Sequence, residues 1–130
     1  MIGLDTNILL RFYLKDDPDQ SARAAALIQS FSAQKPGHIS LVTLAELVWV
    51  MDRTYLKPKN EISALVSGLL ESKQVVLENH NAVLQALRKF DSSNADFSDC
   101  LIERLCASAG CSQTMTFDVG AAKSAGMVLL

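Results

Sequence analysis

Two kinds of hydrophobic pattern alternate along the chain. Short apolar runs of about four residues are separated by longer stretches in which apolar residues recur at helical spacing. The short runs are predicted strands: MIGLD, HISL, QVVLE, TMTFD and MVLL, at 1–5, 38–41, 74–78, 114–118 and 127–130. Strands that alternate with helices are typical of a parallel sheet. The pattern therefore predicts an α/β fold with a small, mainly parallel sheet of roughly five strands and helices on both of its faces.

The longer stretches are predicted helices, at 6–14, 21–31, 42–56, 61–72, 79–90 and 92–110, with a short helical turn at 119–126. The segment DDPDQ is a turn that caps the helix predicted at 21–31. Gly110 is predicted to end the helix at 92–110, as glycine often does. The sequence contains no internal repeat, low-complexity tract or Gly/Ser linker. We therefore expect one domain over 1–130.

Composition places the chain among compact globular proteins, with 49% hydrophobic and 20% charged residues. No apolar run approaches the roughly 20 residues that a membrane span needs. The first residues are not basic, and Asp5 interrupts the only apolar stretch there, so no signal peptide is evident. We expect a soluble, cytoplasmic protein with no membrane partner. The formal net charge of −2 does not by itself indicate nucleic-acid binding.

The cysteines and histidines offer little chemistry. Three cysteines without a C-x-x-C pair argue against a disulfide framework or a zinc site. Cys100 and Cys106 stand among apolar residues and are predicted to be small core residues. His38 and His80 are interpreted as surface or strand-edge residues rather than catalytic bases.

Two aspartates stand where apolar strands end. Asp5 follows IGL, and Asp118 follows TMTF. Ligands of parallel sheets bind at the carboxyl ends of the strands, so these carboxylates would share one edge if the strands were neighbours. Aspartate is also a favoured N-cap, and a helix follows each of them. Capping and ligand binding are equally open for either residue alone.

Glu46 is the only ionisable side chain between Ile39 and Met51. The surrounding helix is apolar nearly all round, which predicts that it is buried. A buried, unpaired glutamate is costly and would take up a proton or find a partner. A salt bridge to an arginine is one such partner. A bound cation is the interpretation that we favour.

A further group of acids lies in NADFSDCLIERL. Asp96 and Asp99 are spaced i, i+3 and share one face at the start of a helix, where Asp96 is a good N-cap. Their like charges repel unless a cation or a hydrogen-bond donor lies between them. Glu103, four residues after Asp99, either faces solvent or belongs to the same rim.

All these acids offer hard oxygen ligands, and no cluster of histidine and cysteine accompanies them. Oxygen ligands select Mg²⁺ or Mn²⁺ over zinc or copper. Magnesium commonly binds through a few carboxylates together with a substrate phosphate. The chemistry that this predicts is metal-assisted hydrolysis of a phosphodiester.

Four segments, in order, resemble the PIN domain family: DTNILL, LAELVWV, ADFSDCLI and TFD. Their order and surroundings are similar to those of the VapC-type toxin ribonucleases of bacterial and archaeal toxin–antitoxin systems. The resemblance extends over essentially the whole chain, including the closing AAKSAGMVLL. It implies a PIN-like three-layer α/β/α fold and a Mg²⁺- or Mn²⁺-dependent ribonuclease that cleaves single-stranded or loop RNA.

The resemblance also assigns the site. The family's catalytic and metal-binding acids match Asp5, Glu46, Asp99 and Asp118, with Asp96 as an additional metal-site acid. Thr6, Asn7 and Thr116 match residues that shape the site through hydrogen bonds. Hydrolysis would leave 5′-phosphate and 3′-hydroxyl ends, because the 2′-hydroxyl is not the nucleophile. Members of the family are typically small dimers that a cognate antitoxin silences, so a homodimer and a VapB-like antitoxin are expected partners.

Charge and hydropathy qualify this expectation. When the five clustered acids are left out, nine Asp and Glu remain against 12 Lys and Arg, so the rest of the surface is expected to be net positive. Arg11 is the nearest candidate for an RNA phosphate contact, or else pairs with an antitoxin or a neighbouring acid. The mean hydropathy of +0.19 favours a dimer contact or an antitoxin groove. An aromatic content of 6% gives little indication of a base-stacking platform.

Three other protein classes are small or acidic enough to be alternatives. A structure-specific DNA nuclease would need an added arch or clamp, for which 130 residues leave no room. A phosphate-accepting receiver domain would need paired acids at its first strand, where only Asp5 stands. A non-catalytic interaction module, in which the acids are structural, is the main alternative. Glu46→Gln separates this alternative from the metal-dependent nuclease, because a structural salt bridge would lose stability whereas a metal ligand would lose activity.

Overall fold

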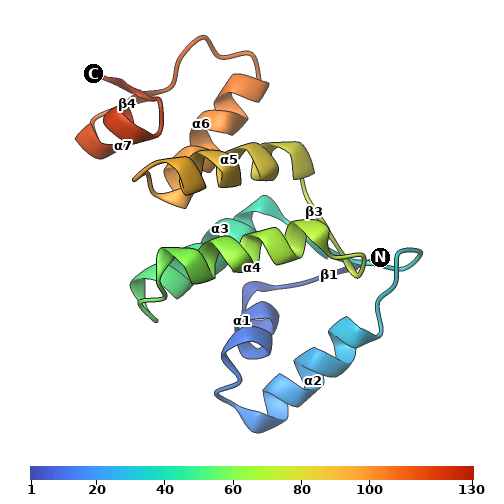
Figure 1. Ribbon diagram of the computed structural model, residues 1–130. Coiled ribbons are helices and arrows are strands. Elements are labelled where there is room, and N and C mark those ends of the chain that lie inside the picture. The colour runs from blue at the N-terminus through green and yellow to red at the C-terminus, as the bar shows by residue number, and fades with distance from the viewer.

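The computed structural model describes residues 1–130 and contains seven helices and five short strands (Figure 1). The strands are β1 (Ile2–Gly3), β2 (Gly37–Ile39), β3 (Val75–Leu77), β4 (Met115–Thr116) and β5 (Val128–Leu129). The helices are α1 (Thr6–Leu14), α2 (Pro18–Gln29), α3 (Leu41–Arg53), α4 (Lys59–Glu71), α5 (His80–Ser92), α6 (Phe97–Ser108) and α7 (Val119–Ser124). Every predicted strand and helix is present, although each strand has only two or three residues.

All strand pairs are parallel, which confirms the predicted α/β class. The first sheet has the order β1-β2-β3, with Ile2 opposite Gly37 and Gly37 opposite Val75. The other two strands form a separate pair, in which Met115 lies opposite Val128. The five strands thus form two small sheets rather than one, because β1 pairs only with β2 and its other edge makes no hydrogen bonds to β4.

Helices surround the first sheet on both sides. In Figure 1, α1 and α2 lie below β1, while α5 and α6 lie above it, and α3 and α4 run side by side between these groups. The segment with β4, α7 and β5 lies at the far end, beyond α6 (Figure 1). This arrangement places the start of α6 and the start of α7 on the same side of the molecule.

One hydrophobic cluster of 23 buried residues joins these elements. Apolar side chains of α3, α4 and α5 face each other in it, as at the fully buried Leu44, Val66 and Val83. Phe97, at the first position of α6, is also buried and meets the Phe90 ring edge to face, with 5.8 Å between ring centroids. The beginning of α6 is therefore anchored in the core, next to the acids that flank it.

The burial of the cysteines and histidines can be compared with what the sequence predicts for them. Cys100 is fully buried, as predicted, and burial raises the pKa of its thiol to about 11, so it stays a neutral core residue. Cys106 is half-buried. His38 is half-buried in β2. His80 is exposed at the start of α5, and its Nε2 atom lies 3.2 Å from the Leu70 carbonyl oxygen.

None of the helices has both the length and the apolar content that crossing a bilayer would require.

Candidate metal centre

Asp5 lies between the end of β1 and the start of α1. Its carboxylate oxygen Oδ1 accepts a hydrogen bond from the Thr6 N–H at 2.8 Å, so it is the N-cap of α1. Its side chain is exposed and borders a surface hollow of about 320 Å³, called here the Asp5 hollow. The lining of the Asp5 hollow is Asp5, Thr6, Asn7, Leu10, Glu46, Trp49 and Val50.

Glu46 is exposed, and the prediction that its helix is buried all round is wrong. The exposed fraction is 79% for Val42 and 54% for Trp49, which lie one turn before and after Glu46 on α3. The opposite face of α3, with Leu44, is buried. Glu46 has no ion pair, so the salt-bridge alternative is not observed. It faces the Asp5 hollow from α3, opposite Asp5 on α1.

Asp96 and Asp99 lie at the beginning of α6. Asp96 is the predicted N-cap, and its Oδ1 accepts hydrogen bonds from the N–H groups of Ser98 at 2.7 Å and Asp99 at 3.4 Å. Its Oδ2 lies 3.6 Å from an Nη2 of Arg53, at the end of α3. Asp99 follows in the first helical turn and is half-buried.

Asp118 lies just after β4 and caps α7. Its Oδ1 accepts a hydrogen bond from the Ala121 N–H at 3.0 Å. The backbone N–H of Asp118 donates to the Thr116 hydroxyl oxygen at 3.0 Å, which fixes the turn from strand to helix. The side chain is exposed, and its second oxygen makes no hydrogen bond within the chain.

The pKa of Asp99 is affected by the charges of two of the other acids, Asp96 and Asp118. Partial burial raises the pKa of its carboxyl, and the nearby charges of Asp96 and Asp118 raise it further, while Arg53 acts in the opposite direction. Three acids from two segments therefore share one region of unfavourable negative charge. A positive ion placed among them would relieve the repulsion, whereas Arg53, whose side chain is 60% exposed, relieves it only in part.

The predicted acids therefore fall into two groups. Asp5 and Glu46 border the Asp5 hollow, whereas Asp99, at the start of α6, lies within electrostatic reach of Asp96 and of Asp118 at the start of α7. The expectation that Asp5 and Asp118 meet at one sheet edge required neighbouring strands, and β1 and β4 belong to different sheets. A second hollow of about 310 Å³, called here the Asp96 hollow, adjoins the second group. It is lined by Val48, Trp49, Asp52, Lys59, Ile62, Phe90, Asn94, Ala95, Asp96, Phe97 and Ser98.

Arg11 pairs with another acid, Asp16, and not with any of these residues. Its Nη1 lies 2.7 and 2.8 Å from the two carboxylate oxygens of Asp16, and its Nε donates to the Gln20 side chain at 3.1 Å. Of the two roles left open for Arg11, the structure supports pairing with a neighbouring acid. The guanidinium would have to leave Asp16 before it could contact an RNA phosphate.

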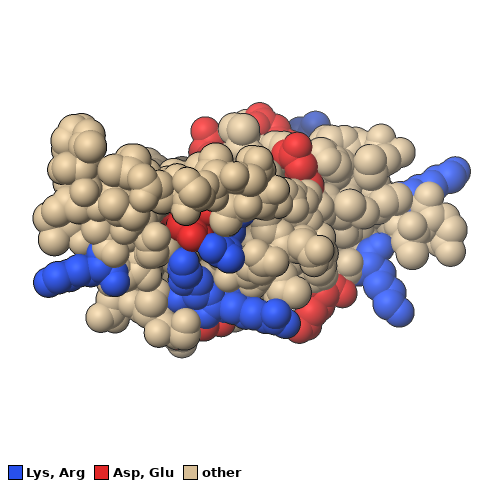
Figure 2. All heavy atoms as spheres, turned by 90° about the horizontal axis from the view of Figure 1, so that it is seen from above, with Lys and Arg blue, Asp and Glu red and all other residues tan.

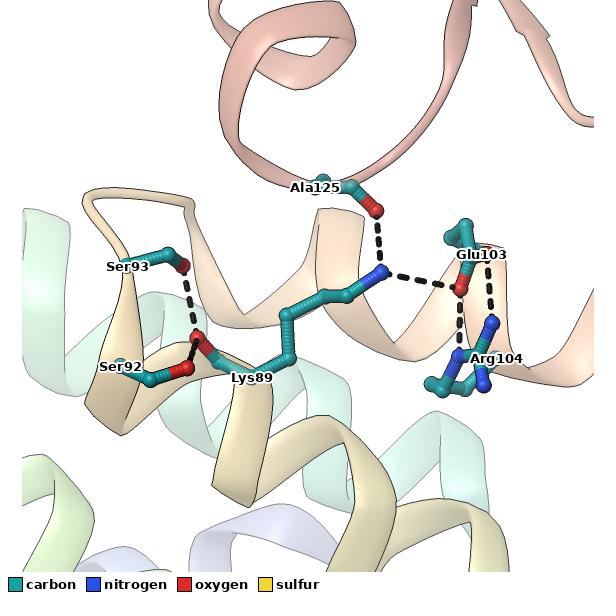
Figure 3. Close-up of polar contacts among 6 residues, drawn as sticks. All are labelled: Lys89, Ser92, Ser93, Glu103, Arg104 and Ala125. Atoms are coloured by element: carbon teal, nitrogen blue, oxygen red, sulfur yellow. Dashed lines mark hydrogen bonds and ion pairs between the residues drawn. The ribbon is translucent and has the colours of Figure 1, made fainter.

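Glu103 neither faces solvent nor joins the acidic rim. Its side chain is only 12% exposed, and Figure 3 shows it between Lys89 of α5 and Arg104 of α6. Hydrogen bonds from Arg104 lower the pKa of its carboxyl, and the positive charge of Lys89 lowers it further. The sequence-based alternatives for Glu103 are both wrong, because a lysine from another helix reaches it.

Lys89 links this pair to the segment that carries Asp118. Its Nζ lies 3.4 Å from Glu103 Oε2 and donates to the Ala125 carbonyl oxygen, at the end of α7, at 2.8 Å (Figure 3). Gly126 follows with φ +82°, and a Cβ there would lie 2.9 Å from Nζ. Only glycine therefore combines this backbone conformation with the close approach of the lysine. The contact holds α7 against α5 and α6.

Lys89→Met is expected to destabilise the protein by about 1.5 kcal/mol, because the Ala125 carbonyl and Glu103 lose a charged donor. Urea denaturation measures the change. Lys123→Met is the matched control, since Lys123 lies on α7, is exposed and has no ion pair, so its loss should stay within about 0.5 kcal/mol. Equal losses in the two variants would show that the Lys89 contact does not stabilise α7.

Charges of both signs gather at this end of the molecule. Figure 2 looks down on it from above, and Lys and Arg side chains lie beside an acidic group near the middle of the face. Other acidic side chains lie along the edges of the same view (Figure 2). The distribution is mixed rather than uniformly basic, in agreement with the net charge of −2.

Sequence reasoning missed three residues near the acids: Trp49, Arg53 and Lys59. Trp49 lies in the helix whose apolar surroundings predict burial, yet it is exposed and borders both hollows. Glu46 and Arg53 are spaced i, i+7, so these polar positions mark one face of α3. That spacing was the available signal that the face with Trp49 is exposed.

The residues fit a hard divalent cation by their chemistry. Asp118 has one carboxylate oxygen that its cap leaves free, and partial burial together with the charges of Asp96 and Asp118 raises the pKa of Asp99. No three His, Cys, Asp or Glu side chains lie close enough to one another to hold a metal ion by themselves. Magnesium usually binds through one or two carboxylates and keeps several waters, so it does not need three protein ligands.

The fold and these acids together define a class of protein: a parallel α/β fold that presents carboxylates from α1, α3, α6 and α7 on its surface. The sequence matches the family model of the PIN domain over residues 2–126. The chain therefore belongs to the PIN domain family, a nuclease-like family whose members are typically Mg²⁺-dependent. No curated protein matches the sequence.

Proposed function

We propose that this protein is a metal-dependent endoribonuclease, the VapC-like toxin of a toxin–antitoxin system, which hydrolyses single-stranded or loop RNA. The observation that carries the proposal is the acid group at α6 and α7. Partial burial, together with repulsion from Asp96 and Asp118, raises the pKa of Asp99, as expected where carboxylates are gathered for a cation. Membership of the PIN domain family supports the same chemistry.

Each acid has a role in this proposal. Asp99 and Asp118 would hold Mg²⁺ or Mn²⁺, with Asp96 beside them, and the ion when bound would supply charge neutralisation at the scissile phosphate. Asp5 and Glu46, across Trp49 from this group, would complete the catalytic acids. Thr116 fixes the turn at Asp118, and Thr6 and Asn7 border the Asp5 hollow. Products with 5′-phosphate and 3′-hydroxyl ends would follow from water as the nucleophile.

The proposed partners are a cognate VapB-like antitoxin and a second copy of the chain. Support comes from large apolar side chains on the surface, such as Leu56 at 79% and Phe117 at 78% exposure. An apolar hollow of about 350 Å³, with Tyr13 and Leu65 in its lining, adds a surface that a partner could cover. Arg11 keeps its proposed phosphate role only if RNA displaces it from Asp16.

One observation favours the alternative of a non-catalytic interaction module. Asp5, Asp96 and Asp118 all cap helices, which is a sufficient structural reason for each of them. Glu46 and Asp99 have no such role, since Glu46 makes no ion pair and Asp99 accepts no hydrogen bond through its side chain. These two residues therefore separate the alternatives best.

The proposal is tested with labelled single-stranded RNA and antitoxin-free protein. We expect cleavage in Mn²⁺ or Mg²⁺, no cleavage in EDTA, and products that a 5′-phosphate-dependent exonuclease degrades. Binding of Mn²⁺, measured by calorimetry on the same sample, is expected at the acid group. Cleavage that persists in EDTA would contradict the metal-dependent mechanism. A folded sample that neither binds Mn²⁺ nor cleaves RNA would favour the interaction module.

A further inference from the structure

Trp49 is the only tryptophan of the chain and is largely solvent-exposed, at 54%. Val42, two turns earlier on the same face of α3, is 79% exposed, so the indole belongs to an apolar strip rather than standing alone, and such strips mark binding sites. Its indole lies on the outward face of α3, one turn beyond Glu46. The opposite face of the same helix is packed into the core, so α3 holds Trp49 on a rigid support.

The position of Trp49 relative to the acids is specific. It borders the Asp5 hollow, which contains Glu46, and also the Asp96 hollow on the other side. It is the only residue that the two hollows share. A nucleic-acid strand that reached both groups of carboxylates would therefore pass over the indole.

The Asp96 hollow supplies the contacts that a nucleotide needs besides stacking. The Lys59 ammonium lies 4.9 Å from the centroid of the Phe90 ring, at the border of this hollow, and donates one of its three hydrogen bonds to the Ser93 carbonyl oxygen. Arg53, 60% exposed, lies next to Asp96. Two cations beside an exposed aromatic suit a phosphate backbone with an unstacked base, and they do not suit a purely apolar peptide.

From this arrangement we infer that Trp49 is the base-stacking residue of a single-stranded nucleic-acid site that joins the two hollows, with Lys59 at the adjoining phosphate. The inference rests on the proposed function, for which it names a contact to the base. It assigns Trp49 to substrate binding rather than to the chemical step. Because stacking tolerates any base, Trp49 would contribute affinity with little sequence preference.

Fluorescence of the single tryptophan tests the inference without any cleavage. The protein is titrated in EDTA, and separately in Ca²⁺, with a short oligouridylate and with an abasic oligonucleotide of the same length. We expect the oligouridylate to change the Trp49 emission and the abasic strand, which keeps its phosphates, to leave it nearly unchanged.

Variants give the affinity. By fluorescence anisotropy of a labelled oligouridylate, Trp49→Ala is expected to weaken binding about 5- to 150-fold, whereas Trp49→Phe keeps most of the affinity. Tyr55→Ala is the matched control, because Tyr55 is an aromatic residue of 41% exposure that borders neither hollow, and its loss should leave binding unchanged. The thermal midpoint of each variant shows that it is folded.

The outcomes separate this inference from the proposed function. Wild-type binding that Trp49→Ala does not weaken would overturn the stacking role and leave the nuclease proposal intact. Equal binding of the abasic strand would overturn it as well. If the Trp49 emission changes with protein concentration but not with added oligonucleotide, the indole lies at a contact between two copies of the chain, and the stacking role is wrong. RNA cleavage in Mn²⁺ without any role of Trp49 in binding would likewise retain the first proposal and reject the second.

Discussion

Asp99→Asn is expected to reduce RNA cleavage at least about 100-fold, because even residues that only support metal ligands cost 10- to 100-fold when they are replaced. Asparagine keeps the size of the side chain but removes the negative charge at the centre of the acid group. Asp96 and Asp118, whose charges raise the pKa of Asp99, cannot replace it as the half-buried ligand. Initial rates in Mn²⁺ at saturating RNA measure the loss.

Asp19→Asn is the matched control for this change. Asp19 also lies in the first turn of a helix, but its side chain is 79% exposed and pairs only with Arg23. The same loss of charge there should leave the cleavage rate unchanged. If Asp99→Asn cleaved RNA as fast as wild type, Asp99 would be a structural residue and the proposed metal centre would be wrong.

The same variant is expected to be slightly more stable than wild type in EDTA at neutral pH. Since the folded-state pKa of Asp99 is raised, the folded protein favours the protonated form. The stability that Asp99 contributes is therefore complete below its unfolded pKa and is lost as the pH rises through the folded value. The difference should be about 0.2–0.5 kcal/mol, as for a like-charge pair one helical turn apart.

Urea denaturation of both proteins across acidic to neutral pH checks the sign. The advantage of Asp99→Asn should disappear as the pH falls and Asp99 takes up its proton. Adding Mn²⁺ should reverse the order, because the cation stabilises only the carboxylate form. A wild-type protein that is the more stable one in EDTA at neutral pH would contradict repulsion among these acids.

Phe97→Ala is expected to destabilise the fold by about 3–5 kcal/mol, a large part of the stability of a domain. The ring is 2% exposed and packs edge to face on Phe90, so its removal leaves a cavity at the first turn of α6. Asp96 and Ser98 flank Phe97, and the loss would loosen the cap that positions the acids. Urea denaturation at constant pH measures the change.

Phe117→Ala provides the same change of side chain at a surface position. Phe117 is 78% exposed, directly before Asp118, and its loss should stay within about 0.5 kcal/mol. If Phe97→Ala cost no more than Phe117→Ala, the core would have repacked around α6. The anchoring of Asp96 and Asp99 by Phe97 would then be wrong.

Local signals predicted the elements of the fold well. The apolar runs marked all five strands, and helical spacing marked the helices between them. The capping role of Asp96, and the glycine end of α6 at Gly110, followed from side-chain chemistry within a few residues. Such signals can be read in sequence because caps and periodic faces depend on neighbours along the chain.

Which face of α3 is buried was not predicted from such local signals. A helix that is apolar nearly all round is expected to be covered, and the covering elements come from elsewhere in the chain. The structure packs Leu44 and Met51 into the core but leaves Val42, Glu46 and Trp49 outside. Which apolar face is covered depends on the placement of α1, α4 and α6.

The sequence by itself determined the α/β class, the order of the elements, the PIN domain resemblance and the acids that the family match makes candidates. Only the tertiary structure decided how the acids of different segments are grouped: Asp118 with Asp99, Glu46 with Asp5, and Trp49 between the two hollows. It also brought Lys89 to Glu103 and to the Ala125 carbonyl oxygen. Helix caps and periodic faces are set by residues close in sequence. The covering of an apolar face, and contacts such as those of Lys89, are set by segments that meet only when the chain folds.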